Sequence, residues 1–272
     1  MRRCAFVRLR VSERLRVPTR VALSCAAMAM SSVALSAQRA PIAPAVRSFV
    51  AVDTAVVALT NVRVIDGTGA APMEGQTLIV RDGRIAALGR TGTVDVPAGA
   101  LVMDLTGKSV IPGLVMVGLD MLVPQLREQY EQRYAATSKQ TQSVYAKLFP
   151  VGMAMERAFA RAGGTLVVGT DPTGGGGLVP GFSNQRAIEL LVEAGFTPLE
   201  AIRMGTLNGA TYLGRNTVGS IATGKQADVL VINGNPAAHI SDVRNVQLVF
   251  KQGVGYDPAA LMQSVKGKAG LY

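Results

Sequence analysis

Histidine is almost absent from this 272-residue chain, and tryptophan is absent altogether. The single histidine is His239, in a stretch with Asn235 and Pro236 that predicts a turn between C-terminal strands. A metal centre held by several imidazoles is therefore excluded within one chain. Ser-His-Asp and Cys-His catalytic arrangements are excluded too, because His239 is the only histidine and the turn in which it lies is not expected to reach a catalytic site.

Cysteine is also scarce, and both cysteines, Cys4 and Cys25, lie near the N-terminus. A chain cleaved after residue 37 would contain none. This excludes disulfides, a thiolate nucleophile and a cysteine-bound zinc ion in the mature part. An exported protein of this kind must be stabilised by its hydrophobic core.

The formal charge of +10 is concentrated at the N-terminus, where residues 1–37 contain seven arginines and one glutamate. That segment carries +6, which leaves an ordinary +4 for residues 38–272. No basic cluster interleaved with aromatic residues occurs there, so we expect no nucleic-acid partner.

Residues 1–37 have the order of a secretory signal: an arginine-rich start, an apolar run over 21–35, then Ser36 and Ala37. We expect export to the periplasm or the exterior. The apolar run is shorter than the ~20 residues of a membrane span, so no stable span is expected after cleavage. An uncleaved anchor and a start codon placed too early stay open.

Strand patterns occur at both ends of the remaining chain. Residues 38–55 are rich in Ala and Pro and predict a linker. Residues 56–109 and 226–256 predict short strands, including a hairpin whose turn is Asp82-Gly83. We expect the two sets to pair in one composite β-sandwich.

Residues 110–225 are mostly helical in pattern, and 257–272 form a polar tail. Thr197, Pro198 and Glu200 predict a capped helix start. Residues 110–122 form a longer apolar run that is broken by Pro112-Gly113. Residues 165–168 predict a short buried strand leading into Gly169-Thr170-Asp171.

Several motifs, in order, resemble the amidohydrolase superfamily, and its imidazolonepropionase and Xaa-Pro dipeptidase-like branch in particular. The resemblance covers residues 56–122 and 151–256. It is carried by 61–67, 79–85, 110–115, 169–171, 193–195, 197–202, 206–208, 219–221 and 224–228.

The resemblance implies a (β/α)₈ barrel with a small sandwich made from both chain ends. It implies hydrolysis of amide-like C–N bonds by a metal-bound water, with Zn²⁺ or another divalent metal held by a His-x-His, two further histidines and an aspartate. Asp171 matches that aspartate, as metal ligand and general base. Gly118-Leu119-Asp120 stands at the His-x-His position, where only Asp120 offers an oxygen ligand.

Only 42 residues lie between Asp120 and Gly163. A whole barrel takes about 250 residues, so six strands with their helices do not fit. The expected fold class is α/β: the sandwich plus an incomplete barrel remnant with the first and last strands only.

The glycine-rich stretch Gly174–Gly177 lacks the Lys-Ser/Thr of a phosphate-binding loop, so a plain loop is expected. A paired-carboxylate site from Asp120 and Asp171 stays conceivable, although no spacing requires it.

These observations favour an amidohydrolase-family protein that is catalytically impaired, with no cofactor expected in this chain. A small-molecule amide substrate and a homo-oligomer stay open as partners. The alternatives are a non-catalytic exported binding or oligomerisation module, the product of an internally deleted gene, and a hydrolase whose site is shared between subunits.

Overall fold

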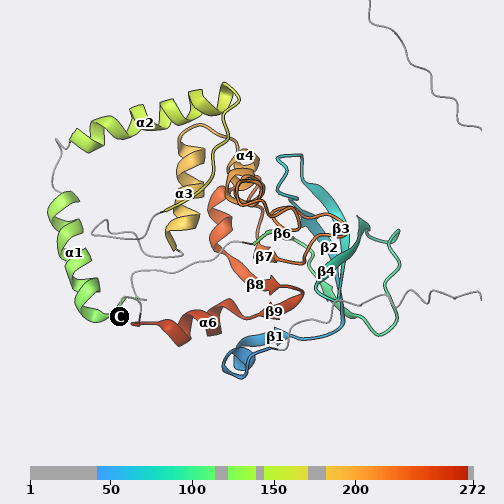
Figure 1. Cartoon of the computed structure of the whole chain (residues 1–272). Helices are drawn as coiled ribbons and strands as arrows, with labels where there is room; N and C mark the ends of the chain where they lie inside the picture. Colours follow the sequence, from blue (N-terminus) through green and yellow to red (C-terminus); the bar gives the residue numbers. More distant parts are fainter. Residues whose placement is uncertain (1–41, 114–121, 139–143, 171–181, 269–272) are drawn as a thin grey trace, which may run out of the picture. The chain divides into compact units, whose positions relative to one another are not determined.

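The computed structural model describes residues 42–113, 122–138, 144–170 and 182–268. The predicted signal, residues 1–37, lies outside this part of the chain. The described residues combine one large mixed sheet with helices drawn from the middle of the sequence (Figure 1).

The sheet has nine strands, in the order β1-β9-β8-β7-β6-β2-β3-β4, with β5 pairing β2 beside this path. The strands are β1 (Val50–Val52), β2 (Val56–Val64), β3 (Met73–Arg81), β4 (Arg84–Arg90), β5 (Leu101–Asp104), β6 (Lys108–Pro112), β7 (Val229–Asn233), β8 (Val246–Lys251) and β9 (Val254–Tyr256).

Strands from both ends of the chain meet at β6 and β7, as expected. The two run antiparallel, with Val110 opposite Val231, while β6 also pairs in parallel with β2. Because β6 joins both halves, all nine strands form one continuous hydrogen-bonded sheet.

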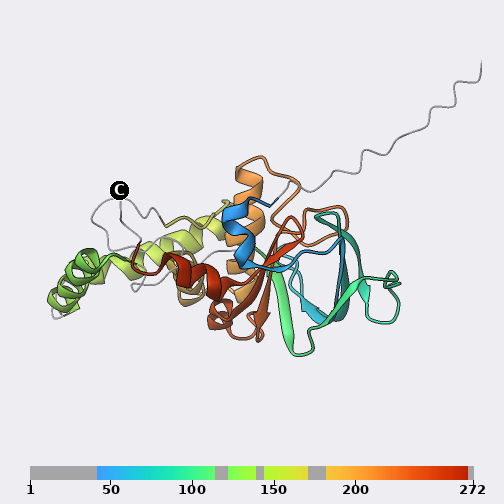
Figure 2. The ribbon, with the colours of Figure 1, turned by 90° about the horizontal axis from the view of Figure 1, so that it is seen from below.

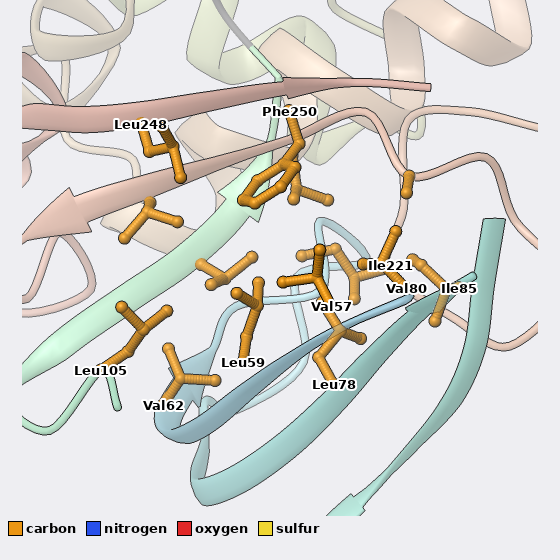
Figure 3. Close-up of a cluster of buried hydrophobic side chains, with 14 of the residues drawn as sticks. Val57, Leu59, Val62, Leu78, Val80, Ile85, Leu105, Ile221, Leu248 and Phe250 are labelled. Atoms are coloured by element: carbon orange, nitrogen blue, oxygen red, sulfur yellow. The ribbon is translucent and has the colours of Figure 1, made fainter. Parts of the chain in front are cut away.

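Alternate residues of the central strands fill two cores, as the period of two in a strand requires. In β7, Val229 and Val231 join one core, whereas Leu230 and Ile232 join the other. In the first core, Leu248 and Phe250 of β8 face Val57 and Leu59 of β2 (Figure 3). The second core lies against α4.

The α-helices are α1 (Pro124–Ser138), α2 (Val144–Arg161), α3 (Phe182–Glu193), α4 (Pro198–Arg203), α5 (Gly209–Tyr212) and α6 (Pro258–Val265). A π-helical segment η3 (Met204–Asn208) joins α4 to α5, and 3₁₀ helices form η1 (Pro44–Phe49) and η4 (Ile240–Arg244). Figure 2 shows α6 near η1, and these two helices are in contact.

The predictions of the hairpin turn and of the helix cap, which depend only on neighbouring residues, are confirmed. Asp82 (φ 49°) and Gly83 (φ 78°) both adopt positive φ in the hairpin turn. Thr197 caps α4: its side chain accepts from the Glu200 amide, and the Glu200 carboxylate accepts from the Thr197 amide.

Three expectations differ from the structure. The stretch 165–168, predicted as a buried strand, belongs to no strand and is only partly buried. The predicted linker contains η1 and β1, which pairs with β9, and the predicted tail contains α6. For 165–168 and for β1 the missing information is the partner, because a strand is stable only beside another strand.

Candidate functional site

The two carboxylates predicted as metal ligands, Asp120 and Asp171, lie outside the described residues. The last described residue before each of these two carboxylates is held by a hydrogen bond. The Gly113 amide donates to the carbonyl of Asp228 at 3.2 Å, and the Thr170 hydroxyl donates to Asn184 Oδ1 at 3.1 Å. The Gly174–Gly177 stretch also lies outside the described part.

Residues 164–170, which include the stretch 165–168 that was expected to be a strand, alternate regularly between half-buried and exposed. Leu166 and Val168 pack towards α2, α3 and the loop before α4. The Val168 amide donates to the carbonyl of Met204 (3.3 Å), and Asn208 Nδ2 donates to the carbonyl of Leu166 (2.8 Å). One edge of this segment is therefore held by η3 rather than by a neighbouring strand.

His239 is exposed and precedes η4. Its amide donates to the carbonyl of Asn235 at 2.9 Å, and its carbonyl accepts from the Asp242 amide at 2.9 Å. The residue is thus part of a turn beside β7, as the sequence predicts, and its backbone rather than its side chain makes these contacts.

Within the described ranges, no three histidine, cysteine or acidic side chains gather closely enough to hold a metal ion. The chain's donor set does not fit the metal centre of the superfamily, because its only imidazole is the exposed His239. We therefore derive no metal-dependent step for it.

The Asp66-Gly67 motif forms a close-packed junction. Gly67 has φ +83°, and a Cβ there would lie 2.8 Å from the Gly219 carbonyl oxygen and 3.0 Å from Thr206 Oγ1. The Asp66 side chain accepts from the amide and hydroxyl of Thr68, and its carbonyl accepts from the Ile221 amide. These family-like residues, 66–67, 206 and 219–221, thus join separate parts of the chain.

The 224–228 motif is also structural. The amide of Gly224 donates to Ile85 and the amide of Ile85 to the carbonyl of Lys225, both at 2.8 Å. The Asp228 carboxylate accepts from Gln226 Nε2 and the Gln252 amide, and it pairs with Lys251. This motif therefore attaches the β3–β4 hairpin to the C-terminal strands.

A charged cluster that the sequence did not predict links α3 to η4. Glu189, with only 9% of its side chain exposed, accepts from Nε and Nη2 of Arg244 at 2.5 Å each, and from Arg186 at 3.3 Å. The Arg244 hydrogen bonds lower the pKa of Glu189, against the opposing effect of burial. Two parallel hydrogen bonds between an arginine and a carboxylate are strong and fix the orientation of both side chains. The cluster therefore acts as a structural clamp between α3 and η4.

A mainly apolar cavity of about 470 Å³ lies between α2, residues 166–169 and α3. Its lining includes Leu148, Phe149, Met153 and Leu190, and its charged residue is Glu156. No helix in the described part is long and apolar enough to cross a membrane.

Comparison with known proteins connects this arrangement to one family. The family model described as "Amidohydrolase family" matches residues 146–255. Imidazolonepropionase of Deinococcus radiodurans is 39% identical over 79 residues, covering 29% of this chain and 19% of that protein. Adenine deaminase 2 of Agrobacterium fabrum is 37% identical over 79 residues, covering 28% and 13%. Each of these matches thus spans less than a fifth of the curated relative.

Two solved structures are similar to this chain in their fold. A putative prolidase from Bifidobacterium longum aligns with TM-score 0.55 and 18% identity, over 77% of this chain and 98% of that one. The A. niger ochratoxinase aligns with TM-score 0.56 and 12% identity, over 74% and 95%. Together with the sequence matches, these show that the chain is similar to proteins of the amidohydrolase superfamily.

Proposed function

We propose that this chain is a catalytically impaired amidohydrolase: hydrolytic by ancestry, acting on C–N bonds, but lacking the means to hold the hydrolytic metal. The observation that carries the proposal is the single histidine. His239 is exposed in the turn before η4, and the position of the expected His-x-His is occupied by Gly118-Leu119-Asp120.

The chemistry supports the same conclusion. Zinc sites in hydrolases use three protein ligands, usually with imidazole nitrogen among them, and the metal lowers the pKa of bound water to about 7. Two carboxylates, Asp120 and Asp171, provide a weaker and harder donor set. Without the metal, no cysteine or serine–histidine pair of the mature part could replace the activated water.

Metal analysis and turnover test this proposal together. The purified protein is loaded with Zn²⁺, dialysed and measured for bound metal, then assayed on small amide, lactam and dipeptide substrates. We expect less than one metal ion per chain and no turnover above that of a His239→Ala control. Stoichiometric metal, with turnover abolished by Asp171→Asn, would overturn the proposal.

The remaining alternative concerns the gene itself. Resequencing between the codons for Asp120 and Gly163 checks whether the short stretch of 42 residues is genuine. We expect the same reading frame. A longer frame carrying barrel strands and histidines would mean that the intact protein is an ordinary metal-dependent hydrolase.

We also propose export, on the signal-like pattern of residues 1–37. Expression in a bacterial host, followed by cell fractionation and intact-mass measurement, tests it. The expected product is a periplasmic or external chain shortened near Ala37. A full-length chain in the cytoplasm would contradict this.

A further inference from the structure

Within the described residues, the segment 164–170 is hydrogen-bonded along one edge only. Leu166 and Val168 make backbone hydrogen bonds to Asn208 and Met204. Because hydrogen-bonding groups of successive strand residues point in opposite directions, those of Thr165, Val167 and Gly169 face the other edge. Among the described residues, none hydrogen-bonds to the backbone of these three. This edge is a template for a further strand.

Helix α2 presents an apolar face to solvent close to that segment. None of its described side chains is buried, although Met153 and Ala160 pack against the core formed around Phe196. Seven large apolar side chains of α2 are between 53% and 83% exposed: Val144, Tyr145, Leu148, Phe149, Val151, Met155 and Phe159. Five of them, at 144, 148, 151, 155 and 159, follow the helical spacing of a packed seam.

The size of this surface matches a protein interface. If an apolar side chain of this size offers roughly 150–200 Å² when fully exposed, the seven together leave roughly 650–850 Å² to solvent. The largest apolar patch of an ordinary monomer is about 300–600 Å². A standard interface buries about 800 Å² on each partner. The face is therefore as large as one side of a stable dimer.

We propose that a second copy of this chain covers this surface, forming a two-fold symmetric dimer. The free edges of residues 165–169 pair antiparallel, with Val167 opposite the partner's Val167 on the two-fold axis. Thr165 then lies opposite the partner's Gly169, and the apolar faces of the two α2 helices are buried together. The proposal does not depend on whether the chain has lost its catalysis.

Self-association fits this surface because part of the apolar face, Tyr145, Leu148 and Phe149, lines the same cavity as residues 166–169. An isologous interface needs one patch that is complementary to itself. An antiparallel strand edge meets this condition, since each Val167 donates to and accepts from its copy. The cavity beside residues 166–169, open between α2 and α3, gives room for side chains of the partner.

Light scattering on the full chain gives the first test. We expect a particle of twice 28.4 kDa. Leu148→Glu should weaken the dimer roughly tenfold or more, because it buries a charge at the seam. Leu213→Glu is the matched control: Leu213 is also well exposed but lies after α5, so the dimer should persist. Circular dichroism verifies that both variants are folded.

Cysteine cross-linking tests the register, in a background where Cys4 and Cys25 are serine. Val167→Cys should oxidise to a covalent dimer, since paired strand residues come within disulfide reach. Thr165→Cys should form roughly tenfold less, because its two copies would lie about 13 Å apart. A monomer at all concentrations, as expected if a segment of the same chain covers the edge, overturns the proposal. The proposal is also overturned if Leu148→Glu leaves the dimer unchanged, or if Val167→Cys and Thr165→Cys cross-link equally.

Discussion

Arg244 and Glu189, 55 residues apart in the chain, form a two-bonded ion pair between η4 and α3. The pair stands where the sheet meets the helical segment, beside Gln185, whose buried amide donates to the carbonyl of Val243 at 2.9 Å. It therefore connects α3 to the η4 turn between β7 and β8.

Removing the Glu189 carboxylate should destabilise the fold. Glu189→Gln leaves Arg244 with a neutral acceptor, and we expect a loss of about 1.5–3 kcal/mol in the free energy of unfolding. Glu193→Gln is the control, because Glu193 pairs with Arg186 at the surface and should change stability by under about 1 kcal/mol. Urea unfolding followed by circular dichroism measures both. Equal losses would show that the pair is no clamp.

The same pair predicts a pH dependence. Hydrogen bonds from Arg244, with help from Arg186, hold the pKa of Glu189 below its ordinary value. A carboxylate of this kind stabilises the fold fully above its unfolded pKa, which is about 4.3, and loses that contribution as pH falls through the lowered folded value. The stability gap between wild type and Glu189→Gln should thus be constant above about pH 5.5 and shrink below about pH 4. A gap that stays constant down to the acid limit of folding would contradict this.

Sequence reasoning recovered the features that are decided locally. The Asp82-Gly83 turn and the Thr197 cap need only neighbouring residues, so composition and spacing identify them. The stretch 165–168 has a strand-like sequence but no strand beside it in the described structure. The Glu189–Arg244 pair left no signal, because its partners are distant in sequence and neither lies in a family-like motif.

Several of the motifs that resemble the amidohydrolase superfamily have a structural role in this chain. Residues 66–67, 206, 219–221 and 224–228 hold separate chain segments together through hydrogen bonds and close packing. These motifs stabilise the composite sheet, whose two halves meet at β6 and β7.

The helix start at Thr197 gives a local test of that composite fold. Thr197→Ala removes the acceptor for the Glu200 amide, and we expect a loss of about 1 kcal/mol in the free energy of unfolding. Thr197→Ser keeps the acceptor and should stay close to wild type. Denaturation curves of the two variants measure the difference. An unchanged Thr197→Ala variant would mean that packing of Ile202 alone holds α4 in place.

Gly67 offers the sharpest distinction between a structural and a reactive motif. Gly67→Ala places a methyl group 2.8 Å from both the Gly219 carbonyl oxygen and Pro112 Cγ, at a φ of +83° that side chains avoid. Gly107→Ala is matched in backbone angle, φ +79°, but its methyl group would meet nothing within 4 Å. The control should lose about 1–2 kcal/mol from backbone strain alone. Gly67→Ala should lose that amount and about 1–3 kcal/mol more from the clash. Thermal and urea unfolding measure the stability of both variants. Equal losses would show that the junction between residues 67, 112 and 219 adjusts to the methyl group and does not hold the N-terminal and C-terminal parts of the fold together.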